Sequence, residues 1–199
     1  MAGMLEQLLS LAAAGVMMIS TSLNAAAPQN DIDGTLFLQN RQWRVGSAYI
    51  PAVRVTEMQG KVRELRDDAA AALEKMAADC KEATGEILVS VSGYRSYQRQ
   101  QEVYAESEPG KAQQPGASEH QTGLAFDVTV ETNDGFESTP QYGWLMAHAH
   151  EYGFIQRYPA NKADVTGISY EPWHYRYVGV DAATRMHNSG QTLEEFLGQ

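Results

Sequence analysis

Apolar residues recur along this chain at two spacings, and each spacing predicts a different kind of element. Over residues 66–85 the apolar positions follow the 3.6-residue period of an α-helix, and Gly85 ends the pattern. The members of this apolar stripe are Ala69, Leu73, Met76, Ala77 and Cys80. Helices are also predicted over 96–107, 139–153 and 192–197, since each of these segments opens with a Ser or Thr suited to capping its N-terminus.

The second spacing is strict alternation, which predicts strands. In "GLAFDVTV" (123–130) every second residue from Leu124 to Val130 is apolar, and Asp127 lies on the opposite face. Further strands are predicted over 86–93, 154–158 and 174–178. Helices and strands that intermingle in this order favour an α+β domain, in which helices flank a small, mainly antiparallel sheet. Residues 30–46 mix polar and apolar positions and predict an arm with short extended pieces.

Composition narrows the classes of function. The chain has 199 residues with 43% hydrophobic content, enough for one domain with a packed core. Its net charge of −10 argues against nucleic acid as a partner, because phosphate binding needs clustered Lys and Arg. The single cysteine, Cys80, excludes an internal disulfide, and its place on the apolar stripe predicts a buried core residue. Any metal must therefore be held by His, Asp and Glu.

Residues 1–27 differ from the rest of the chain. "LLSLAAAGVMMIS" (8–20) is an uncharged apolar run, and small residues up to Ala27 resemble a cleavage region. This pattern predicts a signal peptide, followed by one domain over 28–199, and hence a secreted or cell-envelope protein. No Lys or Arg precedes the run, so an ordinary apolar helix and a cytoplasmic protein are the alternative.

Two polar pairs lie where strands are interrupted. Asp127 is the one charged residue of its strand, and burying it is costly unless it is paired or bound to a metal. Gly123 allows a turn between His120 and Asp127, which an unbroken strand would place on opposite faces. Glu171 and His174 also have an odd spacing, and Pro172 between them predicts a kink or bulge that brings both to one side.

Two imidazoles and a carboxylate form a reasonable ligand set for Zn²⁺ with a fourth position left for water. Spacing alone leaves a salt bridge at Asp127 as an alternative, and a fourth protein ligand, which a structural zinc site would need, has no candidate. The remaining histidines are weaker candidates. His148 and His150 are two apart on one predicted helix and cannot hold one ion together, and His187 lies in a polar stretch that predicts a solvated side chain.

Three ordered motifs carry a resemblance. "SGYRSYQRQ" (92–100), "SEHQTGLAFDV" (118–128) and "EPWH" (171–174) resemble the segments G-Y-R-S, S-x-H-x-x-G-x-A-x-D and E-x-W-H of the zinc D-alanyl-D-alanine carboxypeptidases. That family includes the VanY, VanX and VanXY enzymes of glycopeptide resistance and relatives that trim the cell wall. The resemblance covers about residues 85 to 180, and the surrounding sequence is most similar to the VanY and VanXY branch.

The resemblance implies roles for individual residues. It implies Zn²⁺ on His120, Asp127 and His174, with Glu171 as general base and acid. Substrate-binding and oxyanion-stabilising roles are implied for three others: Arg95, Ser118 and Gln100. A guanidinium is always charged and can donate two parallel hydrogen bonds, which suits Arg95 to a carboxylate or a developing oxyanion; without the motif, a structural ion pair would be the simpler interpretation. We expect Trp173 to pack in the protein rather than to line the site.

The sequence therefore predicts a zinc-dependent D,D-carboxypeptidase that removes the C-terminal D-Ala from peptidoglycan stem peptides or their precursors. An L,D-carboxypeptidase and a D-Ala-D-Ala dipeptidase of the same family are the alternatives within the enzyme class. The alternative from another class is a non-catalytic peptidoglycan-binding module, which has no need of a base such as Glu171. Loops 106–117 and 131–140 are expected to decide between the substrates, and no protein partner is implied.

Overall fold

The computed structural model of the chain describes residues 34–58, 61–108, 111–129 and 135–199. The leader predicted over 1–27 lies outside these residues, as do the start of the predicted arm and part of each predicted specificity loop. In chain order the strands and helices are β1 (Arg54–Met58), β2 (Lys61–Leu65), α2 (Asp67–Thr84), β3 (Val89–Ser92), α3 (Tyr97–Glu106), β4 (Ala125–Thr129), α4 (Pro140–His148), β5 (Phe154–Tyr158), α5 (Ala163–Thr166), β6 (Glu171–Tyr177), α6 (Val180–Ser189) and α7 (Leu193–Leu197).

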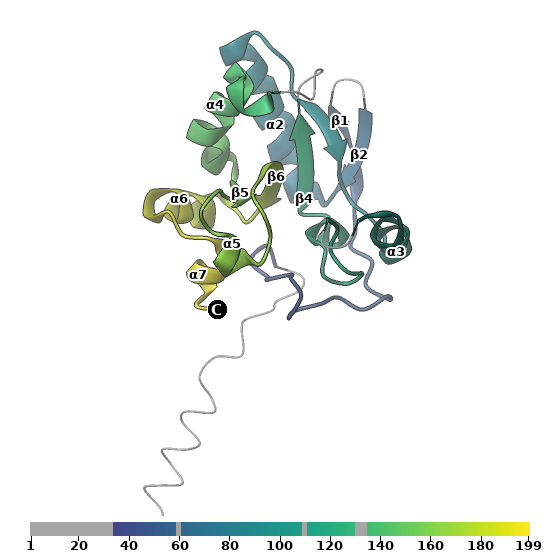
Figure 1. The fold of residues 1–199 in the computed structure, drawn as a ribbon. Coiled ribbons are helices and arrows are strands. Elements are labelled where there is room, and N and C mark those ends of the chain that lie inside the picture. Colours follow the sequence, from purple (N-terminus) through teal and green to yellow (C-terminus); the bar gives the residue numbers. More distant parts are fainter. Residues whose placement is uncertain (1–33, 59–60, 109–110, 130–134) are drawn as a thin grey trace, which may run out of the picture. The chain divides into compact units, whose positions relative to one another are not determined.

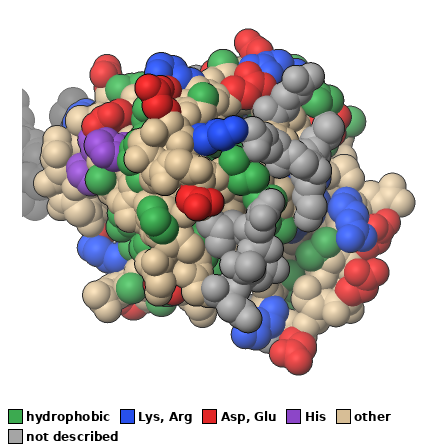
Figure 2. Space-filling view, turned by 90° about the horizontal axis from the view of Figure 1, so that it is seen from above, with side chains coloured by type: hydrophobic (Ala, Val, Ile, Leu, Met, Phe, Trp, Pro, Cys, Tyr) green, Lys and Arg blue, Asp and Glu red, His purple; other side chains and the backbone are tan. Residues whose placement is uncertain are grey.

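Four strands form an antiparallel sheet in the order β3-β4-β6-β5, and β1 and β2 form a separate hairpin (Figure 1). Helices flank the sheet, so the predicted α+β fold is confirmed. Among the described helices, none is both long enough and apolar enough to cross a bilayer. On the face shown in Figure 2, Lys and Arg side chains lie scattered among Asp and Glu side chains.

Helix α2 forms where the apolar stripe predicts it. Its buried residues are Ala69, Ala70, Leu73, Met76 and Cys80. Gly85 ends the helix in the left-handed conformation, with φ of 77°, which a residue without Cβ adopts at little cost. Cys80 is fully buried, as its position on the stripe predicted.

The two faces of the sheet differ in chemistry. Phe126 of β4 lies opposite Tyr175 of β6, and their rings stack with centroids 5.9 Å apart within the core that includes α2. Side chains alternate along a strand. The neighbouring pair, Asp127 and His174, therefore lies on the other face, where the sheet carries polar groups instead of core.

A smaller core cluster lies at the C-terminal end of the chain. Its buried members are Leu38, Val178, Ala182, Ala183, Met186 and Leu193. It joins the arm near residue 38 to helices α6 and α7. Helix α7 begins with a complete capping box, in which Thr192 and Glu195 each bond the other's backbone N–H, as predicted for this segment.

Several elements differ from the sequence prediction. The β1–β2 hairpin and α6 were not predicted. The helix predicted over 139–153 changes at His148 into a 3₁₀ turn, Ala149–Tyr152, before Gly153 at φ 85°. Strand β6 begins at Glu171 rather than at 174, because Tyr158 of β5 pairs with Glu171, whereas β4 pairs with β6 only from His174 onward. Pro172 therefore lies beyond the β4 ladder, and the register with β5 shifts between Gln156 and Tyr158.

Candidate metal centre and active site

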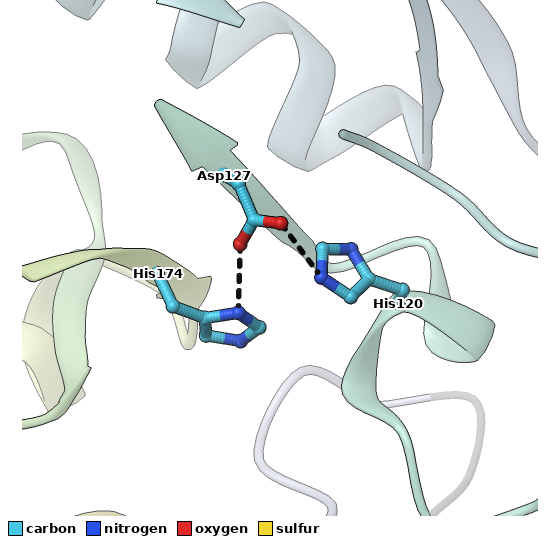
Figure 3. A group of neighbouring side chains, drawn as sticks. All are labelled: His120, Asp127 and His174. Atoms are coloured by element: carbon cyan, nitrogen blue, oxygen red, sulfur yellow. Dashed lines mark hydrogen bonds and ion pairs between the residues drawn. The ribbon is translucent and has the colours of Figure 1, made fainter. Parts of the chain in front are cut away.

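His120, Asp127 and His174 converge on the polar face of the sheet (Figure 3). One ligand atom from each lies within 4.8 Å of the others. Nε2 of His120 lies 3.3 Å from Oδ2 of Asp127, and Nδ1 of His174 lies 3.0 Å from Oδ1. The two imidazole rings meet edge to face, with centroids 5.0 Å apart. One carboxylate thus stands between two imidazoles that approach it from different sides.

Strand pairing and one glycine produce this convergence. Asp127 and His174 are direct partners across the β4–β6 ladder, so their side chains leave the sheet together. His120 lies on the 3₁₀ turn Glu119–Thr122, which Gly123 closes at φ 69°. A Cβ on Gly123 would lie 2.9 Å from Cγ1 of Val53. The turn expected at Gly123 therefore requires glycine for two reasons, its conformation and the close approach of Val53.

The orientation of His120 is fixed by the backbone. Its Nδ1 lies 2.9 Å from the carbonyl oxygen of Gly93. Because a carbonyl only accepts hydrogen bonds, Nδ1 carries the proton and Nε2 presents its lone pair toward Asp127. Burial lowers the pKa of His120 despite the opposing effect of Asp127, so the ring is held in the neutral form that binds metals.

His174 lies between carboxylates on both sides. Its Nδ1 faces Asp127, and its Nε2 lies 3.5 Å from Oε2 of Glu119. Burial alone would lower the pKa of His174, but the hydrogen bond to Asp127 and the neighbouring carboxylate of Glu119 raise it to about 9. Burial would raise the pKa of Asp127, and the charges and hydrogen bonds of the two imidazoles reverse that effect and lower it. Both shifts favour a positive charge on His174 beside the negative charge of Asp127. A metal ion bound between these side chains would supply positive charge at the same place.

The donor set fits zinc. Two imidazole nitrogens and one carboxylate oxygen are the three protein ligands typical of catalytic zinc sites, which leave a fourth position for water or substrate. Each ring has its second nitrogen facing an oxygen, that of Gly93 for His120 and that of Glu119 for His174. Such partners are the usual means of holding a ligating imidazole in place.

Glu171 stands at the edge of this group. Its Oε2 lies 3.8 Å from Nδ1 of His174, and its side chain is 26% exposed. Burial raises the pKa of Glu171, an effect that the charges of Asp127 and Glu119 increase and that His174 opposes. A carboxylate with a raised pKa near a metal position is suited to accepting and returning a proton.

Arg95 faces the same region without a carboxylate partner. Its Nη1 donates to Oε1 of Gln100 at 2.7 Å, and its Nη2 donates to Oγ of Ser92 at 3.1 Å. Both acceptors are neutral, and no carboxylate of the described residues lies within 4.0 Å of the guanidinium. The structural ion pair considered for Arg95 is therefore not formed within the described chain. Burial lowers the pKa of Arg95, and the charges of Asp127 and Glu171, which act from further away, do not reverse this effect.

Gln100 holds Arg95 and does not line the cleft. Its side chain is fully buried, and its Nε2 donates to the carbonyl oxygen of Gln113 at 2.6 Å while its Oε1 accepts from Arg95. Ser118, by contrast, lines the cleft directly before His120. The structure therefore places Ser118 where a bound peptide could reach it, and places Gln100 one layer further in.

These side chains line one cleft of about 230 Å³. The residues of the three sequence motifs that contribute to its wall are Arg95, Ser118, Glu119, His120, Asp127, Glu171, Trp173 and His174. Trp173 is 44% exposed, so the expectation that it packs inside the protein is wrong. It precedes the residues of β6 that pair with β4 and lies where the register with β5 shifts, so strand alternation does not carry it into the core beside Tyr175.

The other histidines lie elsewhere. His148 is paired with Glu151 at 3.2 Å on the surface. His150 and His187 stack in parallel, with ring centroids 3.8 Å apart. No third metal-ligating side chain joins either arrangement among the described residues.

Glu119 is the residue that sequence reasoning missed. It lies between Ser118 and His120 and is fully buried. A signal for it existed in the predicted strands, because Arg157 and Arg176 follow the polar alternation of β5 and β6. A guanidinium buried on a sheet requires a carboxylate nearby.

Comparison with known proteins agrees with this geometry. The sequence model of the family "VanY: D-alanyl-D-alanine carboxypeptidase" matches residues 62–180, more than half of the chain. The putative carboxypeptidase YodJ of Bacillus subtilis is 39% identical over 83% of this chain and 67% of its own length. A D-alanyl-D-alanine carboxypeptidase of Enterococcus faecalis is 42% identical over 60% of this chain, which spans only half of that protein.

Two solved structures are also similar. The LdcB LD-carboxypeptidase, whose structure is described as revealing peptidoglycan recognition, has a TM-score of 0.76 and 38% identity, with coverage of 84% of this chain and 87% of its own. A mutant of the vancomycin-resistance D,D-pentapeptidase VanY in complex with Zn(II) has a TM-score of 0.68 and 35% identity, with coverage of 82% and 98%. The fold and site define a metallopeptidase of the zinc carboxypeptidase type. The chain belongs to the VanY D-alanyl-D-alanine carboxypeptidase family.

Proposed function

We propose that this protein is a zinc-dependent D,D-carboxypeptidase that hydrolyses the last peptide bond of peptidoglycan stem peptides and releases D-Ala. One observation carries the proposal: the half-buried guanidinium of Arg95, which forms no ion pair with a described residue, and the three candidate metal ligands line the same cleft. A carboxypeptidase must bind a terminal carboxylate next to the bond that it cleaves. Arg95 supplies a cation for that carboxylate or for the adjacent carbonyl.

The residues divide the chemistry among them. Zinc held by His120, Asp127 and His174 would supply Lewis-acid chemistry, lowering the pKa of a coordinated water toward roughly 7 and polarising the scissile carbonyl. Glu171 takes the proton of the attacking water and returns it to the leaving amine, which departs as free D-Ala. Arg95 stabilises the charge that develops on the carbonyl oxygen.

Two further residues bind the peptide in this proposal. Ser118 donates a hydrogen bond to the peptide backbone from the wall of the cleft, and Trp173 covers the cleft from the exposed side of β6. Gln100 contributes indirectly, because it holds the guanidinium of Arg95 at 2.7 Å.

An L,D-carboxypeptidase, which removes D-Ala from a tetrapeptide, is the second candidate. The observation in its favour is the similarity to the LdcB LD-carboxypeptidase over 84% of the chain. The D,D-activity is supported by the VanY family match and by the D,D-pentapeptidase structure. Both candidates use the same metal and base and differ in the residue that precedes the cleaved bond.

The test is a substrate panel for the purified protein. Stem pentapeptide, stem tetrapeptide and free D-Ala-D-Ala are incubated separately with the zinc-loaded protein, and released D-Ala is measured by mass spectrometry. We expect release from the pentapeptide, loss of release under a chelator and its return with zinc. Release from the tetrapeptide alone would replace the D,D-activity by the L,D-activity. Binding of peptide without release would support the non-catalytic module.

We also propose that the enzyme acts outside the cytoplasm, on the strength of the apolar segment within residues 1–27. N-terminal sequencing of the protein from its native cell tests this point. A mature terminus near Ala27 is expected, and an intact apolar segment on a cytoplasmic protein would refute it.

A further inference from the structure

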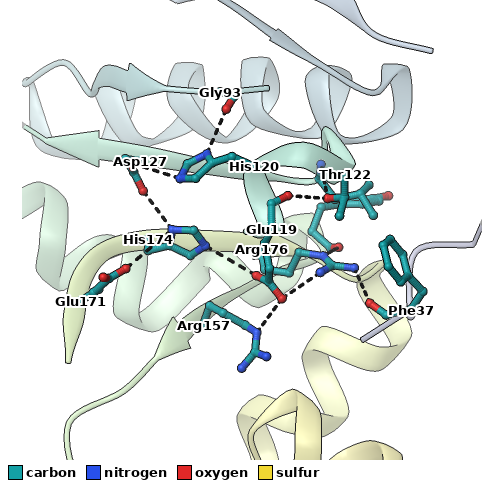
Figure 4. Close-up of polar contacts among 12 residues, drawn as sticks. Phe37, Gly93, Glu119, His120, Thr122, Asp127, Arg157, Glu171, His174 and Arg176 are labelled. Carbon is teal, nitrogen blue, oxygen red and sulfur yellow. Dashed lines mark hydrogen bonds and ion pairs between the residues drawn. The ribbon is translucent and has the colours of Figure 1, made fainter. Parts of the chain in front are cut away.

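Glu119 contacts the outer side of a candidate metal ligand. Its side chain is fully buried, and its Oε2 lies 3.5 Å from Nε2 of His174. Both atoms are buried, and neither makes a hydrogen bond to any other described residue. The two atoms face each other as an ion pair (Figure 4). His174 presents its remaining nitrogen, Nδ1, to Asp127 and the metal position.

The other oxygen of Glu119 is held by two guanidinium groups. Arg157 donates from Nε to Oε1 at 2.8 Å, and Arg176 donates from Nη1 to the same atom at 2.9 Å. Arg176 is fixed in turn, because its Nη2 donates to the carbonyl oxygens of Thr35 at 3.1 Å and Phe37 at 2.8 Å. These bonds leave the Glu119 carboxylate little freedom to turn away from His174.

Helix α7 completes the arrangement. Glu194, on this helix, accepts two parallel hydrogen bonds from Arg157, of 2.8 Å from Nη1 and 2.5 Å from Nη2. Glu119, Arg157, Arg176 and Glu194, which we call the buried ion cluster, contain two carboxylates and two guanidinium groups and are all buried. A buried cluster with balanced charges keeps its geometry, whereas one missing a member leaves an uncompensated charge.

We propose that Glu119 is a positioning residue for the zinc ligand His174, and that the buried ion cluster extends this support to α7 and to the arm at residues 35–37. The inference rests on the proposed function for its metal. Helix α7 and the arm both lie outside residues 62–180, the span matched by the family model. The candidate metal centre is thus supported by segments outside the span that the family model matches.

Physical reasoning gives the size of the effect. A carboxylate that accepts the outer N–H of a ligating imidazole fixes the ring and raises its basicity. Loss of such a partner typically weakens metal binding about 10-fold to 100-fold. Glu194 acts through Arg157 and Glu119, so its loss should weaken zinc binding in the same direction by a smaller factor.

The experiment compares three variants. Glu119→Gln and Glu194→Gln each remove one charge from the buried ion cluster. Glu195→Gln is the control on α7: Glu195 pairs with Lys162 at the surface, and glutamine retains the capping role at this position. Zinc affinity is measured by competition with a chromophoric chelator, and the visible spectrum of the cobalt-substituted protein reports ligand geometry. The unfolding temperature of the metal-free protein is measured in parallel.

We expect the zinc Kd to rise about 10-fold to 100-fold in Glu119→Gln, several-fold in Glu194→Gln and not at all in Glu195→Gln. The cobalt spectrum should change in the first two variants only. A lower unfolding temperature with a zinc Kd within twofold of wild type would overturn the inference, since the cluster would then be structural only. Where Glu119→Gln does not fold, Glu119→Asp retains the charge and withdraws the carboxylate from His174, and the same rise in Kd is expected.

The outcome is separable from that of the proposed function, because zinc affinity is measured without substrate. A wild-type protein that binds zinc tightly and cleaves no stem peptide refutes the proposed activity and leaves this inference standing. A wild-type protein that does not bind zinc refutes both.

Discussion

Two guanidinium groups close to the candidate metal centre have opposite surroundings. Arg157 has carboxylates on both sides, Glu119 and Glu194, and these charges raise its pKa against the effect of burial. Arg95 has two neutral acceptors, Gln100 and Ser92, and burial lowers its pKa. The buried Arg157 thus has ion-pair partners on both sides, whereas the half-buried Arg95 is held by neutral hydrogen-bond acceptors and forms no ion pair with a described residue.

This difference distinguishes an arginine that stabilises the structure from an arginine that is available to bind substrate. A charge matched within the protein fixes geometry and has nothing left to offer a ligand. A charge left unmatched at the wall of a cleft is costly until a substrate of opposite charge arrives. His174 lies between the two kinds of surroundings, with Glu119 behind it and the open cleft before it.

The largest expected effect on activity comes from removing a candidate zinc ligand in the cleft. His120→Ala should lose zinc and reduce peptide hydrolysis to the level of the chelator-treated protein, because two ligands rarely retain a catalytic zinc ion. Metal content by atomic absorption and D-Ala release check this. His148→Ala, which changes an exposed histidine, is the matched control and should leave both unchanged.

Next in size is the loss of the base. Glu171→Gln should lower kcat by about 10²-fold to 10⁴-fold, the usual contribution of a general base, while zinc content stays near one ion per chain. Turnover with the stem peptide and metal content are measured on the same preparation. Near-normal turnover in the variant would contradict the role given to Glu171.

At the buried ion cluster behind His174 we expect the stability of the fold to suffer as well as zinc affinity. Arg157→Met leaves Glu119 and Glu194 without a shared partner, which should cost about 3–5 kcal/mol in the free energy of unfolding. Urea denaturation of the metal-free protein measures the change. Arg99→Met is the control, since Arg99 pairs with Glu102 at the surface and such pairs contribute little. An equal loss of unfolding free energy in the two variants would show that the buried ion pairs of Arg157 contribute no more than a surface pair.

Low pH should destabilise the protein by protonating the buried carboxylate of Glu119. The guanidinium groups of Arg157 and Arg176 outweigh burial and lower the pKa of Glu119 in the folded protein. Its stabilising contribution is therefore present above the unfolded pKa of ~4.3 and is lost as the pH falls below that value. One such carboxyl adds a slope of at most about 1.4 kcal/mol per pH unit. Unfolding free energies of wild type and Glu119→Gln between pH 6 and 3 should show the flatter profile in the variant.

The smallest effect on activity is expected from removing Gln100, the residue that holds the guanidinium of Arg95. Gln100→Ala removes a hydrogen bond of 2.7 Å to Nη1, and a loosened guanidinium should raise KM about threefold to tenfold with little change in zinc affinity. Steady-state kinetics with the stem pentapeptide check this. A collapse of kcat with unchanged KM would instead indicate that Gln100 contacts the reacting group.

The sequence predicted much of the site because local rules governed its parts. Alternation placed Asp127 opposite the core face of β4, and the breakers Gly123 and Pro172 marked the bends that bring the motifs together. Helix α2 followed from a single apolar stripe. These features depend on residues that are close together in the sequence, and the structure contains them where they were predicted.

The features that the sequence did not reveal depend on distant contacts. Arg157 meets Glu119 and Glu194, which are 38 and 37 residues away in the sequence, and no local pattern relates them. The orientation of Gln100 toward Arg95 similarly depends on the loop carbonyl of Gln113. Trp173 was misjudged because aromatic character suggests burial, whereas its exposure depends on where the ladder with β4 ends and the register with β5 shifts.

Asp127 and His174 face each other directly across the β4–β6 ladder. A slip of one residue between these strands would turn one of the two side chains into the apolar layer against α2. A chain that takes up zinc during refolding must therefore already have aligned the two strands correctly. The time course of metal capture would report when the centre of the sheet assembles, without any added probe.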